Sequence, residues 1–68
     1  MNIWEYQVGS MIKLIDIDNK VYVGEVIHIF DCDELESDAD EISVETDSAI
    51  YGFRPDEILS IERIENKN

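Results

Sequence analysis

Carboxylates are the side chains most able to do chemistry in this chain. Residues 31–47 hold nine of the seventeen acidic residues and contain no Lys, Arg or Gly. Oxygen ligands of this kind suit Ca²⁺ or Mg²⁺, but the loop of an EF-hand needs a glycine at its sharp turn. We therefore predict a solvated acidic loop over 32–40, without a metal or another cofactor. The candidate ligands for such a cation are Asp31, Asp33, Glu34, Glu36, Asp38, Asp40 and Glu41.

The other reactive residue types occur singly. His28 is the only histidine and Cys32 the only cysteine, so neither has the partners that a zinc site needs. A single cysteine also excludes an internal disulfide, which fits a reducing compartment. The carboxylates beside Cys32 should raise its pKa and leave the thiol unreactive. No nucleophile elbow, phosphate-binding loop or zinc spacing occurs, so we predict no catalytic residue and no enzyme activity.

Aromatic residues suggest a different role, the recognition of a peptide. Five aromatic residues could form a surface like those that bind proline-rich segments: Trp4, Tyr6, Tyr22, Tyr51 and Phe53. Because the chain around them is acidic, such a surface would prefer basic ligands. The alternative is that they fill the core, which we predict for Phe53 and Tyr22. The candidate protein contacts are therefore Trp4, Tyr6 and Tyr51. Trp4 comes first, because a terminal aromatic in so small a chain often docks on a neighbour.

Size and charge limit the classes of partner. The 68 residues make a single domain, 1–68, whose small core would gain from a partner subunit. A formal net charge of -12 repels nucleic acid and anionic lipid. The first residues lack the basic start and apolar run of a signal peptide, and no segment approaches the roughly 20 apolar residues of a membrane span. We expect a cytoplasmic protein.

The elements that must position these side chains are strands, because Ile, Val and Leu recur between turn-forming clusters. Residues 54–57 should form one helical or 3₁₀ turn, since Pro55 fixes φ and two acids follow it. Residues 3–8 form either a short strand or a helical turn. In 10–17 apolar residues occupy both odd and even positions and so face both sides of a strand. This pattern indicates a bulge or a strand covered on both faces. The predicted strands are 10–16, 20–31, 41–46, 49–53 and 58–64, with 41–46 and 49–53 forming a hairpin.

Residues 20–31 form the clearest predicted element. Twelve residues exceed a typical strand of about 5–6, and a strand of that length must coil. Gly24 inside it permits a sharp bend or a close approach of another backbone. Such a bend lets one strand serve two sheets, as small barrels require. Strict alternation would place Val21, Val23, Ile27 and Ile29 on one face and Tyr22, Val26, His28 and Phe30 on the other.

This order of elements resembles that of SH3-like barrels, and within that class the chain is similar to the Sm-like family. The matching residues are Val8-Gly9 before the first strand, the run 19–26, Phe30-Asp31, and Tyr51-Gly52 followed by the last strand. The resemblance implies an all-β, five-stranded SH3-like or Sm-like barrel with a bent second strand. It also implies assembly into homo-oligomers through the edge strands of neighbouring barrels.

The RNA-binding residues of that family are missing here. RNA-binding members have an Asn and an apolar residue after the Asp, whereas Cys32 and Asp33 follow Asp31. They also have Arg or Lys before the second glycine, where this chain has Tyr51. Only a ring that gathered Arg54 or Arg63 around a pore would supply RNA contacts.

The sequence therefore predicts a non-enzymatic small barrel that self-associates or binds a protein partner, with Sm-type RNA binding as the alternative. A third reading is mimicry of nucleic acid by an array of carboxylates. That reading requires an ordered acidic face, which we do not expect of 32–40.

Overall fold

The computed structural model describes residues 2–64 and confirms the predicted all-β class. Each of the five predicted strands is present within two residues of its expected bounds, and a 3₁₀ turn precedes the last strand as predicted. Residues 3–8 were expected to form either a short strand or a helical turn, and the structure has the 3₁₀ turn η1 there. The elements are η1 (Ile3–Glu5), β1 (Met11–Asp16), β2 (Val21–Phe30), α1 (Cys32–Leu35), β3 (Glu41–Glu45), β4 (Ile50–Phe53), η2 (Pro55–Glu57) and β5 (Ile58–Arg63).

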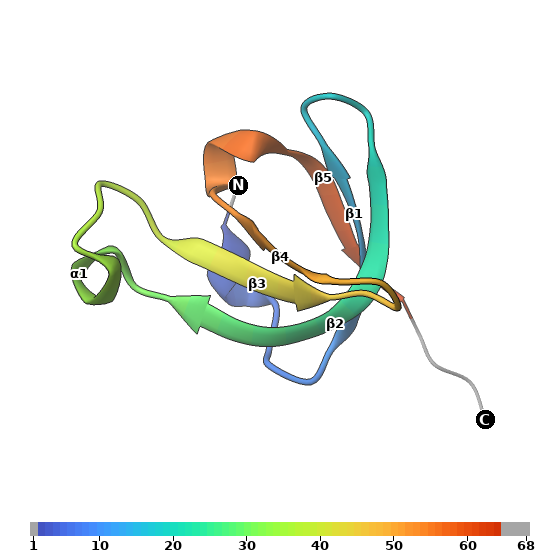
Figure 1. Ribbon diagram of the computed structural model, residues 1–68, viewed down its shortest axis with the longest axis horizontal. Coiled ribbons are helices and arrows are strands. Elements are labelled where there is room, and N and C mark those ends of the chain that lie inside the picture. The colour runs from blue at the N-terminus through green and yellow to red at the C-terminus, as the bar shows by residue number, and fades with distance from the viewer. Residues whose placement is uncertain (1, 65–68) are drawn as a thin grey trace.

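The five strands form one antiparallel sheet in the order β4-β3-β2-β1-β5. Figure 1 shows this sheet curled around a central space, with β2 as a long curved strand that bends with the sheet. Within residues 2–64, β4 and β5 do not pair, so the sheet is not closed into a barrel. The expected closure is therefore wrong: β4 has four residues, and the chain leaves it without pairing with β5. The chain then enters η2 at Pro55, which has no N–H to offer a ladder.

A bend at Gly24 divides β2 into two halves. Residues 21–25 pair with β1, and residues from Glu25 onward pair with β3. A Cβ atom on Gly24 would collide with the carbonyl oxygen of Glu45 and touch the side chain of Val44. The close backbone approach predicted from this glycine is confirmed.

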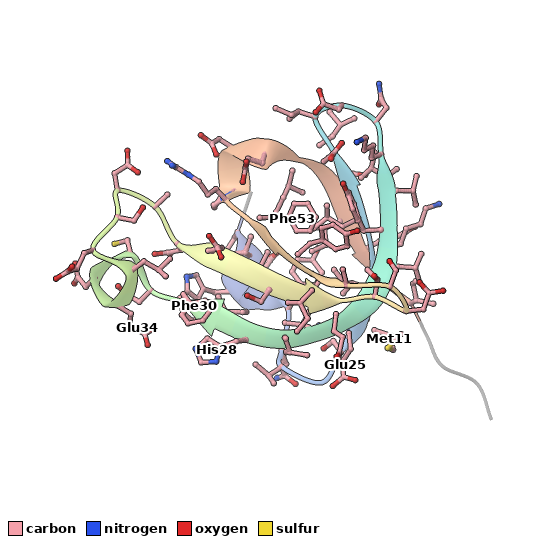
Figure 2. All side chains as sticks on the ribbon, in the orientation of Figure 1. Met11, Glu25, His28, Phe30, Glu34 and Phe53 are labelled. Atoms are coloured by element: carbon pink, nitrogen blue, oxygen red, sulfur yellow. The ribbon has the colours of Figure 1, made fainter. Side chains whose placement is uncertain are left out.

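The alternation predicted along β2 is wrong beyond the bend. The register shifts by one residue between Val26 and His28, which leaves Ile27 as a bulge. Val26 is fully buried and Ile29 packs against the core, although strict alternation puts them on opposite faces. His28 is exposed on the outer side (Figure 2). In β1 the predicted irregularity is confirmed as a register shift between Ile15 and Asp16.

The core draws residues from η1 and from every strand. Phe53 points into the space that the sheet encloses (Figure 2), as predicted, and Ile42 and Val44 are fully buried. Tyr22 is partly buried and packs against this core. None of the helical segments in the described residues is long and apolar enough to cross a membrane. The buried apolar residues are Ile3, Ile12, Leu14, Val26, Ile42, Val44, Phe53 and Ile58.

Candidate interaction surfaces

The edge of β4 presents open backbone groups. The Thr46 N–H donates to the carbonyl of Ala49 across the β3–β4 turn. Since hydrogen-bonded and non-bonded pairs alternate along an antiparallel ladder, the N–H and C=O groups of Ile50 and Gly52 point away from β3. The Ile50 side chain is 60% exposed on this edge. An aliphatic side chain therefore lies beside open donors and acceptors.

The edge of β5 has the same character. The Ile64 N–H donates to the carbonyl of Met11, so the backbone groups of Ile61 and Arg63 point away from β1. Leu59 lies at the β1–β5 bulge, and its side chain is 59% exposed. The Ile61 carbonyl accepts the Tyr6 hydroxyl, so the β5 edge is open only in part. Both ends of the sheet thus combine a strand edge that pairs with no further strand of the described chain with an exposed aliphatic residue.

Charge is distributed similarly along the two edges. Asp47 precedes β4 and Arg54 follows it, while Glu57 precedes β5 and Arg63 ends it. Each edge therefore runs from an acidic end to a basic end. If two such edges pair in antiparallel fashion, opposite charges face each other at both ends of the contact, and such pairs stabilise a ladder.

Arg54 and Arg63, the candidate RNA contacts, are each engaged by other residues. The Arg54 guanidinium lies 2.8 Å from an Asp38 carboxylate oxygen, and its Nε lies 3.7 Å from Asp56. The Arg63 guanidinium donates to the backbone carbonyl of Glu5 at 3.2 Å. These contacts lie on different elements, so the fold does not gather the two arginines into one basic surface.

The three candidate protein contacts also occupy different places. Trp4 is 50% exposed, and its indole N–H donates to Asp40 at 2.7 Å. Tyr6 is half-buried and donates its hydroxyl to the carbonyl of Ile61 at 3.0 Å. Tyr51 is half-buried, and its ring centroid lies 4.8 Å from that of Tyr22. These contacts tie the aromatics into the fold rather than forming one shared aromatic surface.

The acidic segment is more ordered than the sequence led us to expect. Residues 32–35 form the single helical turn α1, where a loop was predicted. An Asp31 carboxylate oxygen accepts the Asp33 N–H at 2.8 Å, and Glu34 accepts the Asp31 N–H at 3.0 Å. This capping box has a readable sequence signature, an Asp followed three residues later by a Glu, which our sequence reasoning missed.

Asp40 ties this turn to the N-terminal segment. Its two carboxylate oxygens accept the Trp4 indole N–H at 2.7 Å and the Cys32 backbone N–H at 2.8 Å. The hydrogen bond from Trp4, followed by that from Cys32, lowers the pKa of Asp40 below its ordinary value. Because these bonds favour the ionised carboxylate, Asp40 stabilises the fold while it is charged.

Asp31, Cys32 and Asp33 bring three potential metal-ligand atoms within 4.8 Å of one another. Burial, and then the charges of Asp33 and Asp31, raise the pKa of the Cys32 thiol, as predicted in direction. A raised pKa keeps the sulfur protonated, and a thiol binds metal only as the thiolate. Ca²⁺ needs six to eight oxygen ligands. The arrangement therefore offers little to either a soft or a hard cation.

No protein-family model matches the chain, and no curated protein or solved structure matches it either. The edges and side-chain contacts described above are thus the basis for a functional proposal.

Proposed function

We propose that this protein is a non-enzymatic interaction module of Sm-like type that self-associates through its strand edges. The observation that carries the proposal is the pair of open edges, β4 and β5, at the two ends of one sheet. Each edge carries one exposed aliphatic residue, Ile50 or Leu59. Open edges with exposed apolar side chains are templates for pairing with another chain.

The proposed contact joins β4 of one copy to β5 of the next copy in antiparallel fashion. Asp47 then faces Arg63 of the neighbour, and Arg54 faces the neighbour's Glu57. Such a contact uses a different edge on each copy, so it repeats from copy to copy and gives a ring where the rotation between copies closes. A closed ring would leave no edge of the sheet open.

Two further features support this assignment. The order of elements along the chain, with a second strand bent at Gly24 and a 3₁₀ turn before β5, is the order that the Sm-like resemblance implies, although the sheet stays open where that resemblance implies a closed barrel. Within residues 2–64 the buried core comprises eight apolar residues, and a small domain of this kind gains stability from burial against a partner. A cytoplasmic location is part of the proposal, because the single cysteine suits a reducing compartment.

The test is the mass of the protein in solution, measured by size-exclusion chromatography with light scattering over a range of concentrations. We expect a mass that is a multiple of the 7.9 kDa chain, and a fall toward 7.9 kDa in Ile50→Lys and in Leu59→Lys. Val8→Lys is the matched control, since Val8 is 62% exposed but lies on neither edge, and it should leave the mass unchanged. A wild-type protein that stays at 7.9 kDa at high concentration would contradict the proposal.

Sm-type RNA binding is the weaker alternative. It has to recruit Arg54 away from Asp38 and Asp56, and to overcome the repulsion between phosphate and a net charge of -12. Binding of oligo-uridine that weakens with added salt and is lost in Arg63→Gln would favour this alternative. The absence of binding at low salt would exclude it.

A further inference from the structure

A groove opens where β2 and β3 separate at the bend. Because β2 pairs with β3 only from Glu25 onward, residues 21–24 pair with β1 alone. The opposite wall is the β3–β4 turn at 45–48, and Tyr22 and Tyr51 contribute to the lining. The volume is about 670 Å³, within the range of ligand-binding clefts.

One wall of this groove is an open strand edge. The Val26 N–H donates to the Ser10 carbonyl on the β1 side of β2. Alternation along the strand then turns the N–H and C=O groups of Val21 and Val23 toward the groove. In the described structure no strand pairs with them there. Open backbone groups in such a position can accept an extended peptide as an added strand.

The side chains along this edge specify the chemistry of an occupant. Val21 and Val23 are 55% and 51% exposed on the outer face, and Glu25 follows on the same face. Glu25 stands directly opposite Glu45, and Asp47 lies in the facing wall. Figure 2 shows Glu25 on the outer side of the sheet beside Met11.

Lys13 stands opposite Val23 on β1 but does not line the groove. Among the described residues that line the groove, none is Lys or Arg. Like charges directly opposite one another destabilise a ladder, and a cation placed between Glu25 and Glu45 relieves that repulsion. The groove therefore complements a ligand that is both aliphatic and basic.

We propose that this groove binds an extended segment of a partner protein in which a Lys or Arg is followed, at alternate positions, by two aliphatic residues. Every ladder in this sheet is antiparallel, so the added strand continues the line of β3 against β2. Its aliphatic residues then pair with Val23 and Val21. Because Glu45 already pairs with Glu25, the basic residue lies outside the ladder at the end of β3, where its side chain reaches the two carboxylates. The groove shares Asp47 with the β4 contact proposed above, but its open edge at Val21 and Val23 belongs to neither β4 nor β5, so failure of self-association leaves this inference standing.

The test uses a short fluorescein-labelled peptide with the core Lys-Thr-Val-Thr-Val and measures its fluorescence anisotropy against the wild-type protein. We expect saturable binding that weakens with added salt, and about threefold to tenfold weaker binding when Glu replaces the Lys. Methylation of the two Val amides keeps the side chains but removes the N–H donors that the pairing needs. This change should abolish binding.

Protein variants identify the binding site. The double variant Glu25→Gln/Glu45→Gln should weaken binding and remove most of its salt dependence. Glu62→Gln, which neutralises an exposed carboxylate on β5, should leave both unchanged. The double variant removes a like-charge pair, so we expect it to fold as well as the wild type.

Three results would overturn the proposal. The first is no saturation at millimolar peptide, and the second is equal binding of the Lys and Glu peptides. The third is saturable binding of the peptide by Ile50→Lys protein but none by the wild type at the same concentration, which would mean that a second copy of this chain fills the groove.

Discussion

Two groups of carboxylates in this molecule have opposite roles although their residue types are the same. In the acidic segment at 31–40, Asp31, Glu34 and Asp40 accept hydrogen bonds from backbone N–H groups, and Asp40 also accepts one from Trp4. At the bend, Glu25 faces Glu45 across two strands, without a cation among the described residues of the groove. The first group stabilises the fold, whereas the second repels itself and is open to a ligand.

The number of carboxylates in a segment therefore does not tell how many of them are free to bind a ligand. The run at 31–40 is the most conspicuous acidic feature of the chain, yet several of its carboxylates satisfy donors that a helical turn would otherwise leave unpaired. The acids at the bend lie far apart in sequence and are brought together only because β2 and β3 meet at Gly24.

Replacing the glycine at the bend should have the largest effect. In Gly24→Ala the new Cβ meets the backbone carbonyl of Glu45, which cannot move without separating β2 from β3. We expect a loss of about 1–3 kcal/mol in the free energy of unfolding, measured by urea denaturation. Gly52→Ala is the control, since its Cβ meets only the flexible side chain of Glu41. Equal destabilisation by the two variants would show that the bend does not require a glycine.

Removing the carboxylate that joins α1 to the N-terminal segment should have the next largest effect. Asp40→Ala deprives the Trp4 indole and the Cys32 N–H of their acceptor. We expect the Tm to fall by several degrees, roughly 4–8 °C. Asp33→Ala removes an exposed acid that accepts no backbone N–H in the described structure, so it should change the Tm much less. If Asp33→Ala is as harmful as Asp40→Ala, net charge rather than hydrogen bonding governs this segment.

The same contact should depend on pH in one direction. Because hydrogen bonds lower the pKa of Asp40 in the folded state, its contribution is fully present above the unfolded value of about 3.9. The contribution is lost as the pH falls through the lower, folded-state pKa. Trp4 is the only tryptophan, so its fluorescence reports the contact. We expect a transition below about pH 4 that is missing in Asp40→Ala. A transition above pH 5 would contradict the assignment.

Neutralising Glu25 and Glu45 at the bend should have the smallest effect on stability. It should raise the Tm, whereas the variants above lower the stability of the fold. Glu25→Gln/Glu45→Gln relieves a cross-strand repulsion, so we expect the Tm to rise slightly, by about 1–4 °C at low salt. Glu62→Gln should lower the Tm slightly, because Glu62 lies opposite Lys13. The contrast should disappear at high salt. A fall in Tm for the double variant would mean that these carboxylates already have partners.

The sequence predicted the strands well because local alternation and turn residues determine them. Ile42 and Val44 alternate cleanly in β3, and both are fully buried. Gly24 inside a long run of β-branched residues correctly indicated a close backbone approach. The 3₁₀ turn that begins at Pro55 follows from the fixed φ of proline.

Other features depend on contacts between distant segments. The bulge at Ile27 reverses the faces of β2, and simple alternation gives no sign of it. The failure of β4 to pair with β5 depends on how far the sheet curls. The bond between Trp4 and Asp40 joins residues 36 positions apart. The groove likewise arises only where β2 and β3 diverge. Its three carboxylates, Glu25, Glu45 and Asp47, come from separate parts of the chain, so no sequence motif marks them.

The most direct test of the contrast between the two acidic groups is an amide chemical-shift titration of the ¹⁵N-labelled protein with the Lys-Thr-Val-Thr-Val peptide. We expect the shifted amides to lie at 21–25 and 45–48, and those at 31–40 to keep their chemical shifts. Shifts concentrated at 31–40, with none at the bend, would contradict it.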